Sequence, residues 1–172
     1  DKVVERGMEA IIKQAKDRLD RFERERISDE TKINFLKSVI ISLEAAITFA
    51  ERHARLAENL ASETKDPKEK KRYMMIADAC WNVPRNKPRT FYEAIQSAWF
   101  TLCVGEIQYG THEVFAVGRS DQYLYPYFKV DIERKVMTRE EAISLLQEFY
   151  LKITASVEPI PELEMETNGV LG

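Results

Sequence analysis

Residues 118–127 read Gly118-Arg119-Ser120-Asp121-Gln122-Tyr123-Leu124-Tyr125-Pro126-Tyr127, and the rest of the chain is organised around this stretch. Opposite charges, Arg119 and Asp121, stand two positions apart, and three tyrosines follow within five positions. The sequence before this stretch has the spacing of amphipathic helices, and the sequence after it predicts one more helix and a tail. The stretch is therefore a junction, which is either a structural corner or part of a site.

A short helix over residues 122–131 is expected to follow the two charges directly. Asp121 is predicted to cap it, because a carboxylate before the first turn accepts a free backbone N–H. Arg119 and Asp121 are expected to point inward and pair with neighbouring elements, since an unpaired buried charge is costly. The last helix is expected from Thr138, where Thr138 and Glu141 form a capping box.

The first 83 residues are predicted to form amphipathic helices. Apolar residues recur at helical spacing over 4–22, which predicts a single first helix. A long second helix is expected after a cap at Ser28, and a third over 67–83, capped by Asp66 and burying Trp81. With the later elements, about six helices are expected, so the fold is predicted to be mainly α, with one short strand.

The helix expected over 91–104 is apolar on nearly all sides, which predicts that it is buried. Thr90 and Glu93 form a second capping box at its start. A glycine-punctuated segment follows, in which 114–117 is typical of a short strand. A buried helix that leads into such a loop is a candidate ligand wall, with His112, Glu113 and Phe115 in the loop. The alternative is a structural loop with His112 and Glu113 in solvent.

Composition excludes several classes of function. A net charge of −3 leaves no basic excess for binding nucleic acid. Uninterrupted apolar runs such as 39–41 are far shorter than the ~18 residues that cross a bilayer, so no membrane span is expected. Cys80 and Cys103 lack a CxxC spacing and a nearby histidine pair, which argues against a metal site. Two isolated thiols favour a reducing cytoplasm.

Two longer runs resemble a known family. Residues 89–100, Arg-Thr-Phe-Tyr-Glu-Ala-Ile-Gln-Ser-Ala-Trp-Phe, resemble the "TFxEAxQxxWF" stretch of glycyl radical enzymes, the relatives of pyruvate formate-lyase. Residues 118–127 resemble that family's "GRxDQYxYPxY", and Asp131-Ile132 and 137–142 continue the match. Arg119, Asp121 and Tyr125 are then structural members of the motif.

The resemblance implies a fold and a place within it. The family forms a ten-stranded α/β barrel whose two half-barrels surround a buried site. The whole chain, 1–172, is expected to be an N-terminal-to-middle fragment of that domain, with the amphipathic helices in 1–83 and the motif-bearing part in 90–155. The chain is expected to begin in mid-protein.

The resemblance also implies chemistry for a longer parent enzyme. In this family a backbone glycyl radical near the C-terminus passes to a cysteine, whose thiyl radical takes a hydrogen from a small organic substrate. A separate radical S-adenosylmethionine enzyme with an iron–sulfur cluster installs the radical. The parent is expected to be an anaerobic, cytoplasmic homodimer. Its reaction would be that of a lyase, dehydratase or decarboxylase that cleaves C–C, C–O or C–N bonds, or of a formate acetyltransferase.

The family's radical residues lie downstream of the last motif, beyond Gly172. Neither Cys80 nor Cys103 stands in the motif of the thiyl cysteine. No catalytic residue and no bound cofactor are therefore assigned to this chain, which is expected to be inactive alone. The absence of both radical residues leaves a second hypothesis open, a non-catalytic helical interaction module.

One segment departs from the family pattern. Many relatives have "NGHSxSxGR" where residues 111–119 read Thr-His-Glu-Val-Phe-Ala-Val-Gly-Arg. His112 is offset by one position, and Ala116 replaces a serine. This segment lines the pocket in polyol- and amine-cleaving relatives, so the resemblance implies the pocket residues Thr111, His112, Glu113, Phe115 and Ala116. The change from the family pattern favours a more apolar or aromatic substrate.

Overall fold

The structure is a computed structural model that describes residues 2–109 and 117–156, and these residues are helical wherever they are regular. In chain order the described helices are α1 Lys2–Arg6, α2 Met8–Arg24, α3 Glu30–Glu63, α4 Pro67–Asn82, α5 Phe91–Tyr109, α6 Ser120–Glu133 and α7 Arg139–Ser156. The mainly α prediction is confirmed for this part of the chain. The strand expected over 114–117 lies outside the described residues except for Val117, which belongs to no regular element.

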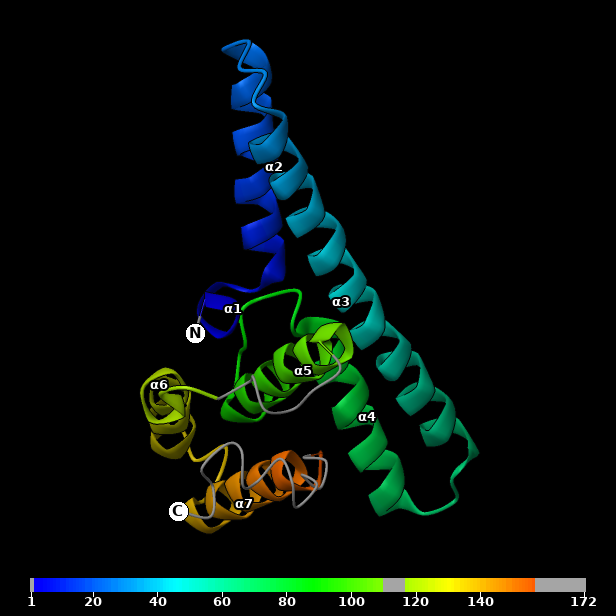
Figure 1. Ribbon diagram of the computed structural model, residues 1–172. Coiled ribbons are helices and arrows are strands. Elements are labelled where there is room, and N and C mark those ends of the chain that lie inside the picture. Colours follow the sequence, from blue (N-terminus) through cyan, green and yellow to red (C-terminus); the bar gives the residue numbers. More distant parts are fainter. Residues whose placement is uncertain (1, 110–116, 157–172) are drawn as a thin grey trace, which may run out of the picture.

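The helices divide into a projecting arm and a compact cluster (Figure 1). Helices α2 and α3 pack as an antiparallel hairpin that projects from the cluster, and α4 packs back along the second half of α3. Helix α5 lies in the middle, in contact with α1, α3, α4, α6 and α7. The 34 residues of α3 make a helix about 50 Å long at 1.5 Å per residue.

The largest core lies where α5 meets α1, α6 and α7. Helix α5 contributes Phe91, Ala94, Ile95, Ala98 and Leu102, so the predicted burial of this helix is confirmed. The other members come from three helices that are distant in sequence, and they are Val4, Leu124, Ala142 and Phe149. Helix α5 therefore packs against α1, which lies before the junction at 117–119, and against α6 and α7, which follow it.

The single helix predicted over 4–22 is wrong, because the chain breaks at Gly7. Gly7 has φ +80°, and a Cβ there would lie 2.5 Å from the carbonyl carbon of Asn86. The first N–H groups of α2 are donated to the adjacent loop, from Met8 to the Pro84 carbonyl (2.8 Å) and from Glu9 to the Arg85 carbonyl (2.9 Å). The break turns α1 back onto α5 and makes seven described helices where about six were expected.

The predictions for α3 and α4 are confirmed in part. Asp66 caps α4 by accepting the Lys68 N–H (2.8 Å), as expected. The cap of α3 is Asp29 and not Ser28, because the Asp29 carboxylate accepts the Lys32 N–H (3.1 Å). Trp81 was expected to be buried, yet it is 37% exposed on the surface of α4.

The last predicted cap is confirmed in full. Thr138 Oγ1 accepts the Glu141 N–H (3.1 Å), and the Glu141 carboxylate accepts the Thr138 N–H (2.7 Å). These reciprocal hydrogen bonds satisfy two free donors of the first turn. Helix α7 therefore starts where the sequence placed it, with Ala142 and Phe149 buried in the core.

Helix α3 buries a row of small residues. Its buried side chains include Ala46, Ala50, Ala54, Ala57 and Ala61. This face allows α4 and α5 to approach closely, because alanine side chains are short. By length and composition α3 is also the one helix in the described ranges that is apolar enough to cross a membrane, a test that buried core helices pass as well.

Candidate functional site

The junction between α5 and α6 is built on Gly118. Its φ is +61° and no atom lies within 4 Å of where a Cβ would be, so a left-handed backbone and not crowding requires glycine here. The Ser120 N–H donates to the Gly118 carbonyl (3.0 Å), and α6 begins at Ser120, two residues earlier than predicted. Asp121 lies inside the first turn and is not the cap of α6.

Arg119 and Asp121 pair with each other at the surface. Arg119 Nε lies 3.0 Å from Asp121 Oδ1, and Nη2 lies 2.9 Å from Oδ2. This pairing holds the pKa of the Asp121 carboxyl below its usual range. Their side chains are 71% and 65% exposed, so the expectation that both point inward is wrong. The pair neutralises itself in solvent, which leaves it little role in stability.

Two of the three tyrosines anchor the junction through their hydroxyl groups. Tyr123 donates to the carbonyl of Val117 (2.9 Å), and Tyr127 donates to the carbonyl of Val4 in α1 (2.7 Å). Burial raises the pKa of Tyr123 to about 12. Tyr125, the third, is 59% exposed on the other side of α6. The aromatic part of the stretch therefore fixes the junction to α1 and to its own preceding residues.

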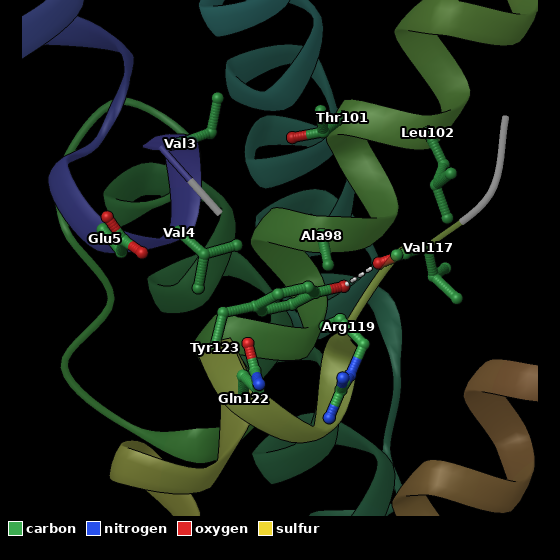
Figure 2. A pocket seen from close by; sticks show the side chains of 11 residues that line it. Val3, Val4, Glu5, Ala98, Thr101, Leu102, Val117, Arg119, Gln122 and Tyr123 are labelled. Atoms are coloured by element: carbon green, nitrogen blue, oxygen red, sulfur yellow. Dashed lines mark hydrogen bonds between the residues drawn. The ribbon is translucent and has the colours of Figure 1, made fainter.

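A cavity of about 550 Å³ opens where α1, α5 and the junction meet (Figure 2). Its wall is partly apolar, with Val4, Leu102 and Tyr123 among the lining side chains. Polar groups come from separate elements, and they are Glu5, Thr101, Arg119 and Gln122. Apolar surface with a few polar groups is typical of a site for a small organic molecule.

The predicted pocket residues Thr111, His112, Glu113, Phe115 and Ala116 lie outside the described residues, so their role stays a prediction. Val117, the next residue, lines the cavity. Sequence reasoning missed Glu5, Thr101 and Gln122 as lining residues. The signal for Glu5 was Gly7, whose break turns α1 back toward the junction.

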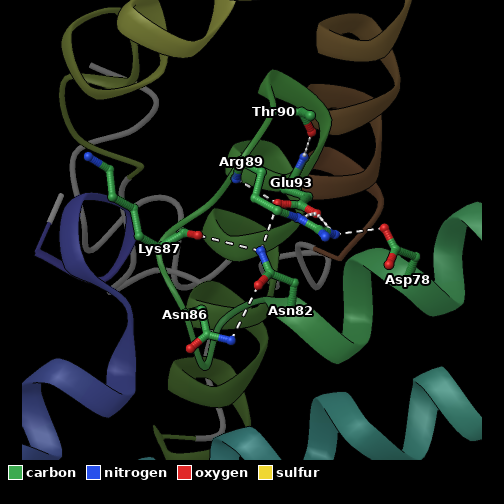
Figure 3. A network of polar contacts seen from close by, with 7 residues as sticks. All are labelled: Asp78, Asn82, Asn86, Lys87, Arg89, Thr90 and Glu93. Carbon is green, nitrogen blue, oxygen red and sulfur yellow. Dashed lines mark hydrogen bonds and ion pairs between the residues drawn. The ribbon is translucent and has the colours of Figure 1, made fainter.

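The start of α5 is fixed by a buried carboxylate, Glu93 (Figure 3). Its side chain is 4% exposed, and it accepts hydrogen bonds from Arg89 N (2.6 Å), Arg89 Nε (2.8 Å) and Asn82 Nδ2 (2.8 Å). This hydrogen bonding raises the pKa of the Arg89 guanidinium. The predicted capping box is thus half formed, because Thr90 accepts the Glu93 N–H (3.2 Å) while the carboxylate turns to Arg89.

A second buried carboxylate reaches the same end of α5 from α6. Asp131 is 3% exposed, and its Oδ2 accepts the backbone N–H of Phe91 (2.7 Å). Negative charge is favourable at a helix N-terminus, where the free N–H groups and the helix dipole are directed. Glu93 and Asp131 together hold the helix that forms one wall of the cavity.

Neither cysteine is placed for chemistry in the cavity. Cys80 and Cys103 are both free, and neither lines it. Burial raises the pKa of both thiols to about 11, so both stay protonated at neutral pH. No group of metal-ligating side chains occurs within the described ranges. Among the described residues, then, the lining of the cavity contains no thiol.

Solved structures with the same arrangement of helices are glycyl radical enzymes. The B12-independent glycerol dehydratase of Clostridium butyricum, a glycerol-bound form, is 35% identical and superposes on 95% of this chain with a TM-score of 0.83. A glycyl radical enzyme of Archaeoglobus fulgidus is 33% identical over 82% of this chain, with a TM-score of 0.77. The chain belongs to the pyruvate formate lyase-like family, whose model matches residues 1–167.

The curated relatives are far longer than this chain. The isethionate sulfite-lyase of Nitratidesulfovibrio vulgaris is 34% identical over 148 residues, which is 86% of this chain and 18% of that protein. The two solved structures above are covered to 20% and 18% of their length. The chain thus spans about a fifth of the proteins that it matches.

Proposed function

We propose that this chain is a segment of an anaerobic glycyl radical enzyme and is inactive alone. The parent would be a lyase, dehydratase, decarboxylase or formate acetyltransferase that acts on a small organic substrate. The observation that carries the proposal is the family match over 1–167, together with a TM-score of 0.83 over 95% of the chain. In this proposal the segment is part of the ten-stranded barrel domain of the parent.

The segment's own part in catalysis would be to shape and fix one wall of the substrate pocket. Val117 lines the cavity directly after the predicted pocket residues 111–116, and the Tyr123 hydroxyl holds its carbonyl. Thr101 and Gln122 are neutral hydrogen-bonding groups there, whereas Arg119 is already paired with Asp121. A neutral hydrogen-bonding group of the substrate would suit Thr101 and Gln122, and a hydrogen-bond donor would suit the Glu5 carboxylate.

The cofactor and partners follow from the same assignment. The glycyl radical and the thiyl cysteine would be supplied by the remaining polypeptide, and they provide hydrogen abstraction from the substrate. A radical S-adenosylmethionine activase with an iron–sulfur cluster would install the radical. We further propose a cytoplasmic homodimer without a membrane or nucleic-acid partner. The names of the relatives cover several substrates, among them isethionate and trans-4-hydroxy-L-proline.

The reading frame that carries these residues tests the proposal. We expect it to continue past residue 172 and to encode both a cysteine on a central loop and a glycine motif near its C-terminus. A frame that encodes neither would overturn the enzyme assignment and leave the helical interaction module.

The pocket is tested separately in the longer protein. Gln122→Ala should raise the KM for the substrate with little change in melting temperature, because Gln122 lines the cavity and is exposed. Lys129→Ala on the same helix is the matched control, since Lys129 does not line the cavity. Equal KM values for both variants would show that the cavity does not bind the substrate.

A further inference from the structure

A second cavity, of about 400 Å³, lies between α6 and α7, apart from the candidate site. We call it the α6–α7 groove. Its buried or half-buried wall is hydrocarbon and aromatic, formed by Phe91, Leu124, Phe128 and Leu146. Because Phe91 and Leu124 belong to the main core, the groove is an opening into the core from the surface.

The rim of the groove exposes large apolar side chains. Tyr125 is 59% exposed, Ile143 is 55% exposed and Tyr150 is 44% exposed. Single exposed apolar residues are ordinary, but a group of them around an apolar concavity marks an interaction surface. The groove is therefore shaped to receive apolar side chains from another segment.

The polar groups that line the groove differ in whether another described residue satisfies them. Ser120 Oγ and the Tyr150 hydroxyl lie 2.7 Å apart and satisfy each other. Asp121 is neutralised by Arg119. Arg139, at the start of α7, forms no ion pair with any other residue that the structure describes. The charge left for an occupant is one guanidinium, which a carboxylate would match.

We infer that the α6–α7 groove is the docking surface for an apolar segment of the longer polypeptide, and that a carboxylate of this segment meets Arg139. The inference rests on the proposed function, in which this chain is a segment of a longer enzyme. Relatives are about five times as long, with 18% of the isethionate sulfite-lyase covered, so most of such a protein is available to fill the groove. A segment of the same polypeptide docks at high effective concentration.

A second copy of the chain fits the groove less well. A stable interface between separate proteins uses about 20–30 residues on each side. The groove is lined by 11 residues, three of which are large apolar side chains on its rim. Such a small apolar opening suits an intramolecular contact, where no translational freedom has to be lost.

Cysteine labelling of the longer protein tests the inference. Ile143→Cys and Tyr125→Cys place thiols on the rim, and Lys71→Cys on the solvated face of α4 is the matched control. Labelling with a maleimide is followed by peptide mass spectrometry, which separates the introduced thiols from native ones. We expect both rim positions to react at least tenfold more slowly than the control, at every protein concentration.

Two results would overturn the inference. Rim thiols that react as fast as the control would show that the groove is open in the longer protein. Protection that disappears on dilution would show that a second copy fills it. Arg139→Glu supplies an independent measurement, because it should lower the melting temperature of the longer protein more than Lys68→Glu does, and Lys68 is likewise an exposed basic residue in the first turn of a helix. Labelling needs no activated enzyme, so its failure is distinct from failure of the radical assignment.

Discussion

The carboxylate of Asp131 accepts the backbone N–H of Phe91 at 2.7 Å, across 40 positions of sequence. Phe91 opens the buried helix α5, and Asp131 lies near the end of α6. Both residues are buried, so water cannot replace either partner. This one hydrogen bond joins the two motif-bearing helices, α5 and α6.

Asp131→Ala should lower the free energy of unfolding by about 1–3 kcal/mol, because it leaves a buried N–H without an acceptor. Asp131→Asn keeps an acceptor and should lose less. Asp121→Asn is the matched control, since its carboxylate is exposed, and it should change stability little. Urea unfolding measures all three, and equal losses for Asp131→Ala and Asp121→Asn would contradict the assignment.

Gly7→Ala should destabilise the protein by about 2–5 kcal/mol, the sum of a left-handed backbone and a steric clash. The clash arises because the new Cβ would lie 2.5 Å from a backbone atom of Asn86. Gly118→Ala has the backbone cost alone, about 1–2 kcal/mol, since its Cβ would meet no atom within 4 Å. Thermal unfolding of the two variants should therefore separate them. A smaller loss for Gly7→Ala than for Gly118→Ala would refute the tight contact.

Tyr123 should ionise far above an ordinary tyrosine. Its pKa is raised to about 12 by burial, from a usual value near 10.0. The folded state therefore keeps the proton that the unfolded state releases, and stability should fall as the pH rises from about 10 to 12. Comparing absorbance titrations of the protein and of Tyr123→Phe isolates this group. The difference between the two titrations belongs to Tyr123. A pKa near 10.0 in this difference would show that the Tyr123 hydroxyl is open to solvent.

The two thiols should react slowly in the folded protein. Burial raises the pKa of both Cys80 and Cys103 from 9.0 to about 11, so little thiolate is present at pH 8. Unfolding should restore ordinary alkylation rates. Because the unfolded state loses these protons first, stability should also fall between about pH 9 and 11. Fast alkylation of either native thiol by iodoacetamide would contradict its burial.

Two helix starts, those of α4 and α7, were predictable from the local chemistry of their ends. Asp66 and the pair Thr138 and Glu141 make the hydrogen bonds that their spacing indicates. The burial of α5 followed from apolar residues on nearly all its sides. These features depend on neighbours within four positions, which a sequence displays directly.

The remaining features depend on distant partners. The break at Gly7 depends on the loop at Pro84–Asn86, and the loss of the reciprocal cap at Thr90 depends on Arg89 and Asn82. Arg119 and Asp121 were expected to seek inward partners, yet they satisfy each other in solvent. The cavity likewise lies between α1, α5 and α6. No local sequence pattern predicts that these three helices lie together.

The assignment to glycyl radical chemistry is tested most directly by electron paramagnetic resonance of the longer protein after anaerobic treatment with its activase. We expect an organic radical signal that disappears on exposure to oxygen and is absent when the C-terminal motif glycine is replaced by alanine. Residues 1–172 alone should give no signal under the same treatment. A longer protein that stays free of radical with an active activase, or a radical that survives the glycine replacement, would contradict the assignment.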